Sequence, residues 1–154
     1  MNRAFVREQD DEKPPELPDR PISSFPNFVT REGFAAIDAH AASSREELAT
    51  AQAADDRIAI ARAMRDLRYW SARRASAEIV DPPADGSVAR FGSVITIRRG
   101  EGREQTYRIV GEDEADPTHG TLSHASPLAQ AILGKSIDED VIVNGAEIQI
   151  VAIA

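Results

Sequence analysis

An acidic segment in the second half of the chain holds the densest group of side chains that could bind a cation. Glu112, Asp113, Glu114 and Asp116 occupy four of five consecutive positions. Carboxylate oxygens are the ligands that Ca²⁺ and Mg²⁺ take from proteins, and the spacing resembles part of an EF-hand loop. The glycine and the final glutamate of that loop are missing here. We therefore interpret residues 112–116, the acidic turn, as a solvated loop rather than a metal site.

A second pair of carboxylates, Asp55 and Asp56, lies in a short polar break between two helical segments. Aspartate is among the best N-cap residues, and negative charge at a helix start suits the helix dipole. Capping alone can therefore explain the pair, and a metal-assisting role stays open beside it. The three histidines show no spacing typical of zinc ligands, and the absence of cysteine excludes disulfides and thiolate metal sites.

Two helices must position Asp55 and Asp56. Thr30 is a suitable N-cap for the first helix, with Glu32 in its first turn. Apolar or small residues then recur at the spacing of a coiled-coil seam, first at Phe34, Ile37, Ala41, Ser44, Leu48 and Ala51, and then at Ile60, Met64, Leu67 and Ser71. The polar break at 53–56 predicts an antiparallel hairpin with helices near 32–53 and 56–79, although one continuous helix remains an alternative.

A β-rich region follows the paired prolines Pro82 and Pro83, which cannot continue a helix. Strands are predicted at 94–97 and 107–110 around a glycine-rich turn, at 121–124, and at 141–143 and 147–153 around Asn144-Gly145. Ser126 and Pro127 predict the N-cap and first residue of a short helix ending near Leu133. We expect an α+β protein in which a helical hairpin precedes a small antiparallel β domain with one short helix.

Four segments result from these patterns. Residues 1–27 hold five of the nine prolines and an acidic run, so we expect a disordered acidic, proline-rich tail. Residues 28–80 form the helical hairpin, 81–89 a linker, and 90–154 the β domain.

Two stretches resemble a known family. Residues 107–135, YRIVGEDEADPTHGTLSHASPLAQAILGK, closely resemble the C-terminal domain of the bacterial Gre transcript-cleavage factors, GreA and GreB. Residues 28–34, FVTREGF, look like the segment that opens the N-terminal hairpin of GreB-type members. The resemblance implies an FKBP-like fold for residues 90–154 and an accessory factor that docks on RNA polymerase without a catalytic centre of its own.

In that family the hairpin enters the polymerase secondary channel, and two acidic residues at its tip help to hold a catalytic Mg²⁺ that promotes hydrolysis of backtracked RNA. The resemblance makes Asp55 and Asp56 the candidate tip carboxylates, binding Mg²⁺ only together with the polymerase. The family's tip motif and roughly two to three turns of each helix are missing here. A short-armed regulator, similar to the regulator of nucleoside diphosphate kinase, is therefore the alternative: it would compete for the channel without promoting cleavage.

The resemblance also makes Asp113, Glu114 and Asp116 candidates for contacts with basic residues of the polymerase, and it makes Ser126 and Pro127, at the neighbouring helix start, further partner-binding candidates. Net charge is −8, and residues 81–154 carry 12 acidic and 6 basic side chains. Without a Lys/Arg cluster we expect no direct nucleic-acid binding. We also expect a cytoplasmic monomer with no membrane segment, and we treat an FKBP-type chaperone or isomerase as a remote alternative, because aromatic residues make up only 5% of the chain.

Overall fold

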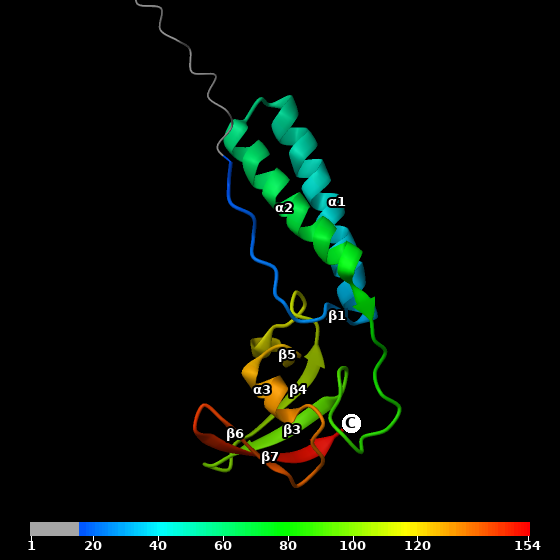
Figure 1. Cartoon of the computed structure of the whole chain (residues 1–154), viewed down its shortest axis with the longest axis vertical. Coiled ribbons are helices and arrows are strands. Elements are labelled where there is room, and N and C mark those ends of the chain that lie inside the picture. The colour runs from blue at the N-terminus through cyan, green and yellow to red at the C-terminus, as the bar shows by residue number, and fades with distance from the viewer. Residues whose placement is uncertain (1–15) are drawn as a thin grey trace, which may run out of the picture.

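The computed structural model describes residues 16–154 and consists of an elongated helical hairpin standing on a small β domain (Figure 1). The two parts are joined at one end of the hairpin, so that its tip lies far from the sheet. Within the described residues, no helix is long and apolar enough to cross a membrane.

The hairpin, which we call the arm, consists of α1 (Arg31–Ala53) and α2 (Arg57–Ser76). Thr30 caps α1 by accepting a hydrogen bond from the Gly33 N–H, as predicted. Four of the predicted seam residues of α1 are buried, namely Ile37, Ala41, Ser44 and Ala51. The seam predicted for α2 is wrong at Met64, which is 44% exposed, because Ala63 takes the inner position one residue earlier. The antiparallel arrangement is confirmed, and a single continuous helix is excluded.

A short parallel strand pair closes the base of the arm. β1 (Phe28–Val29) pairs with β2 (Glu78–Ile79), so the entry into α1 and the exit from α2 are held side by side. Neither strand was predicted, because two residues carry no detectable periodicity.

The β domain contains a five-stranded sheet in the order β5-β4-β3-β7-β6. Its strands are β3 (Val94–Arg99), β4 (Glu104–Val110), β5 (Thr121–Ser123), β6 (Asp140–Val143) and β7 (Ala146–Ile153). α3 (Pro127–Ile132) begins at the predicted cap, with the Ser126 hydroxyl accepting from the Ala129 N–H. The α+β class is confirmed.

One feature of the predicted sheet is wrong: β5 runs parallel to β4. The acidic turn and a 3-10 helix at Pro117–His119 lead the chain from the end of β4 back along that strand, so that β5 starts opposite Arg108 and runs in the same direction as β4. A parallel pair needs such a crossover, whereas a short hairpin turn would have made the pair antiparallel. The remaining neighbours, β3–β4, β3–β7 and β6–β7, are antiparallel as expected.

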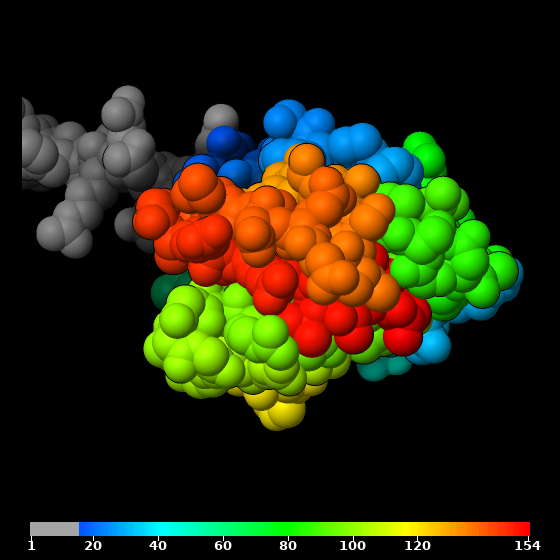
Figure 2. All heavy atoms as spheres, turned by 90° about the horizontal axis from the view of Figure 1, so that it is seen from below, coloured from blue at the N-terminus to red at the C-terminus, as the bar shows by residue number. Residues whose placement is uncertain are grey.

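The domain core is a cluster of buried aliphatic side chains from all five strands, α3 and the segment before β3, including Ile95, Ile97, Ile109, Ile132 and Ile150. Figure 2 views the molecule from below, at the end opposite the arm's tip. There β7 lies between the segment of α3 and β6 and the β3–β4 hairpin.

Of the tail predicted to be disordered, residues 16–27 contact the arm, and residues 1–15 lie outside the described residues. Residues 16–27 run along the arm beside α2 (Figure 1). Asp19 pairs with Arg68 at 2.6 Å, and the Arg20 guanidinium lies 3.9 Å from the centre of the Tyr69 ring. Composition alone did not reveal this packing, because it depends on aromatic and charged partners supplied by α2.

Candidate functional site

The tip of the arm is formed by Ala54, Asp55 and Asp56. Asp55 adopts a left-handed conformation with φ of 49°, which Asp tolerates better than most residues and which lets the chain reverse direction. The Asp56 Oδ1 accepts a hydrogen bond of 3.1 Å from the Ala59 N–H and so caps α2. Both side chains are exposed, and within residues 16–154 the Asp55 carboxylate has no hydrogen bond or ion pair.

The two tip carboxylates do not form a metal site by themselves. Mg²⁺ requires six oxygen ligands, and one oxygen of Asp56 is already used by the cap. In the described part of the chain, no group of three or more histidine, aspartate or glutamate side chains is arranged to hold a metal. The pair could therefore serve only as part of a site whose other ligands come from water and a partner.

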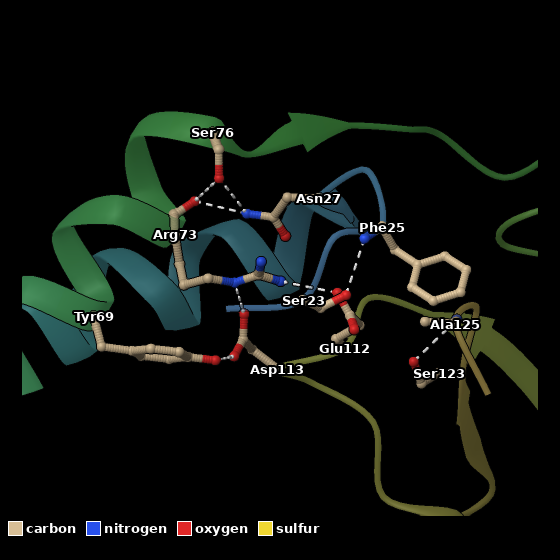
Figure 3. Close-up of polar contacts among 10 residues, drawn as sticks. All are labelled: Ser23, Phe25, Asn27, Tyr69, Arg73, Ser76, Glu112, Asp113, Ser123 and Ala125. Carbon is tan, nitrogen blue, oxygen red and sulfur yellow. Dashed lines mark hydrogen bonds and ion pairs between the residues drawn. The ribbon is translucent and has the colours of Figure 1, made fainter. Parts of the chain in front are cut away.

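The acidic turn contacts the arm rather than projecting into solvent (Figure 3). The Asp113 Oδ2 accepts a hydrogen bond of 2.6 Å from the Arg73 Nε, and its Oδ1 accepts one from the Tyr69 hydroxyl. A second, longer ion pair of 3.4 Å joins Arg73 to Glu112. The Arg73 side chain is only 3% exposed and that of Asp113 10%, so this is a buried charge pair between α2 and the β domain.

These contacts change the ionisation of Tyr69. Burial, followed by the hydrogen bond to the Asp113 carboxylate, raises the pKa of Tyr69 to about 12. The phenol therefore stays protonated and remains a donor to Asp113.

Glu114 attaches the acidic turn to the other helix. Its Oε2 accepts from the Thr30 N–H at 3.0 Å, and its Oε1 accepts from the Thr30 hydroxyl. Because that hydroxyl also caps α1, Glu114 holds the start of the helix. Gly33 makes the approach possible, since a Cβ there would lie 1.9 Å from the Glu114 Oε2.

The prediction that Asp113 and Glu114 are polymerase contacts is therefore not supported by their surroundings. Sequence reasoning treated carboxylates in a turn as solvated, whereas the fold brings Thr30, Tyr69 and Arg73 against them. Tyr69 and Arg73 are one helical turn apart on α2, a spacing that places both on the same face of the helix.

The other three predicted contact residues are Asp116, the last residue of the acidic turn, and Ser126 and Pro127, which follow it in the chain. Asp116 is exposed and caps the 3-10 helix, where hydrogen bonds from the Thr118 hydroxyl and from His119 lower its pKa. Pro127 is exposed and Ser126 half-buried at the start of α3. The role of these three residues as partner contacts stays a prediction.

An aromatic cluster at the junction was missed entirely. Phe25, Phe28 and Phe91 surround His124, with ring centres 5.5 to 6.3 Å from its own. The His124 side chain is buried, its Nε2 has no hydrogen-bond partner within the described residues, and burial lowers its pKa. These residues line a cavity of about 490 Å³, so the low aromatic content did not exclude an aromatic-lined pocket.

Comparisons with known proteins agree with this architecture. Residues 84–154 match the family model described as "Transcription elongation factor, GreA/GreB, C-term". GreA of Staphylococcus carnosus is 39% identical over 79 residues, which are 49% of this chain and 49% of that protein, so the match spans about half the length of that relative. GreB of Pasteurella multocida is 33% identical over 135 residues, covering 75% of this chain and 85% of that protein.

Among solved structures, GreA factor homolog 1 (Gfh1) of Thermus thermophilus is 20% identical and covers 82% of this chain and 97% of its own. The TM-score is 0.41, and a similarity of this extent supports no conclusion about function.

Proposed function

Because the chain belongs to the GreA/GreB family of transcription elongation factors, we propose that it binds RNA polymerase and places its arm in the secondary channel of that enzyme. The observation that carries the proposal is the arm itself, a two-helix projection whose free end exposes two adjacent carboxylates. The β domain would supply the docking surface, and the family match over residues 84–154 supports that division of roles.

On this proposal the chain contributes side chains to a reaction centre that belongs to its partner. Asp55 would offer its whole carboxylate, and Asp56 the oxygen that the cap leaves unused. A Mg²⁺ ion held there with the polymerase's own ligands would supply a water of lowered pKa for hydrolysis of backtracked RNA. The arm's own part is to carry the two carboxylates to that place and to keep them there.

A second action at the same partner is favoured by the arm's dimensions. The 23 residues of α1 span about 34 Å at ~1.5 Å per residue. This is shorter than the hairpin implied by the family resemblance, and half of the Asp56 carboxylate is used in capping. We therefore favour a factor that occupies the channel entrance and competes with longer-armed relatives over one that strongly stimulates cleavage.

Gel analysis of stalled, 3′-backtracked transcripts distinguishes these actions. The samples are polymerase with the wild-type chain, with Asp55→Asn/Asp56→Asn, and with a mixture of wild type and a long-armed Gre factor. Asparagine keeps the cap acceptor and removes the charge that a metal needs, whereas alanine would also cost about 1 kcal/mol of capping.

Under the competing action, wild type gives no cleavage above the polymerase's own rate and lowers the cleavage produced by the long-armed factor. Under the cleavage action, wild type accelerates the reaction and the asparagine pair does not, although it still binds. Absence of any binding to polymerase would refute both.

A further inference from the structure

The arm and the β domain do not share a core. The main buried apolar cluster lies entirely within residues 89–150, while α1 and α2 bury a separate set of mostly small side chains and Ile37. At the junction, Phe28 packs on Phe91 and His124. Hydrogen bonds and ion pairs between the arm and the β domain add stricter directional constraints on the angle between them.

The directional contacts come from three successive residues of the acidic turn. Asp113 and Glu112 hold Arg73 on α2, and Asp113 also holds Tyr69 one turn earlier. Glu114 holds Thr30 at the start of α1. With a single attachment the arm could rotate about that point. Attachments to both helices restrict this rotation and so define the direction of the arm relative to the β domain.

Small errors at the base become large at the tip. For an arm of about 34 Å, a rotation of ~10° at its base displaces the tip by about 6 Å. Catalytic and metal-binding groups act only within much smaller tolerances, since a misplacement of about 1 Å can cost ~100-fold in rate. A rigid base is therefore required if the tip is to act at a defined place.

We propose that the acidic turn fixes the direction of the arm on the β domain, with Asp113 as the central positioning residue and Glu114 as the second point of attachment. This inference rests on the proposed function for its purpose, but the rigidity itself can be measured in the free protein. Arg73 makes the attachment strong, because releasing Asp113 would leave a buried guanidinium with only the longer contact to Glu112.

Distances between spin labels test the proposal without the polymerase. The chain has no cysteine, so Ala53→Cys at the end of α1 and Ala146→Cys in the β domain, both exposed positions, give one labelled pair in the full-length protein. Pulsed electron paramagnetic resonance should show a narrow distance distribution in this parent. Asp113→Ala should broaden it by several Å, the displacement that about 10° of freedom produces over the arm.

Asp116→Ala is the matched control, because this carboxylate of the same turn bonds only within its own loop in the described structure. Glu114→Ala removes the second attachment without leaving a buried charge, so it should broaden the distribution even if Asp113→Ala folds poorly. Helix content by circular dichroism should stay at the parent's level in Glu114→Ala.

Equal widths in the parent, Glu114→Ala and any folded Asp113→Ala would overturn the inference. The positioning role and the proposed function can be refuted independently of each other. Broadened distances in a protein that does not bind polymerase would refute the function and leave the positioning role intact, whereas polymerase binding with unchanged distances would do the reverse. If both hold, Glu114→Ala should still bind polymerase but lose the effect of the arm on backtracked complexes.

Discussion

At the scale of single residues, the junction depends on a phenol that donates to a carboxylate. Desolvation and Asp113 raise the pKa of Tyr69 to about 12, above the ordinary value of 10.0. A raised pKa means that the neutral form is favoured in the folded state. The stability that this provides is complete below pH 10 and is lost as the pH rises towards 12.

We therefore expect ultraviolet titration of tyrosinate to show one transition near pH 12 that is absent from Tyr69→Phe. The unfolding free energy of wild type should fall more steeply between pH 10 and 12 than that of the variant. A Tyr69 transition at the ordinary tyrosine value would contradict the buried hydrogen bond to Asp113.

At the scale of elements, Gly33 is an exception to helix propensity. Glycine in a helix is about 1 kcal/mol less favourable than alanine, yet α1 carries one in its first turn. The space that a Cβ would fill is taken by the Glu114 carboxylate. The helix thus gives up intrinsic stability for a contact between the arm and the β domain.

A double-mutant cycle should expose this exchange. In wild type, Gly33→Ala should bring no gain in unfolding free energy, because it displaces Glu114 from Thr30. Hydrogen bonds to charged groups contribute ~1.5–3 kcal/mol, enough to cancel the helical gain. In a Glu114→Ala background the same change should stabilise the protein by about 1 kcal/mol. Equal effects of Gly33→Ala in both backgrounds, measured by urea unfolding, would show that the contact has no energetic weight.

At the scale of the whole molecule, charge governs how the protein meets its proposed partner. Net charge is −8. Two carboxylates of the acidic turn, Asp113 and Glu114, bind Arg73 and Thr30 within the molecule and are therefore not available to a partner. The exposed Asp116 remains as a carboxylate that could face a basic surface near the start of α3.

Asp116→Lys should therefore weaken binding to RNA polymerase. The difference in affinity between wild type and variant should shrink at high salt, because screening weakens charge interactions with the polymerase for both. Glu101→Lys, an exposed carboxylate in the β3–β4 turn, is the control for net charge. Dissociation constants at two ionic strengths provide the measurement. If the two variants lose affinity equally, the effect is one of overall charge and the docking surface lies elsewhere.

The sequence by itself determined the elements whose signals are local. Thr30, Asp56 and Ser126 cap helices that begin where their side chains predicted, and Asn144-Gly145 reverses β6 into β7 with positive φ at both residues. Helix caps and tight turns depend on residues only a few positions away, so they can be predicted from short segments of the sequence. The exposed pair at the tip was located for the same reason.

Tertiary structure decided which side chains meet. Whether a carboxylate at 113 is solvated or buried depends on an arginine 40 positions earlier, and no local pattern encodes that approach. The direction of β5 likewise depends on how the chain crosses from β4, and the packing of residues 16–27 depends on Tyr69 and Arg68 of α2. Polar contacts between distant segments are set by the three-dimensional path of the chain. For this reason the acidic turn resembled a partner-binding surface in the sequence, whereas in the fold it connects the arm to the β domain.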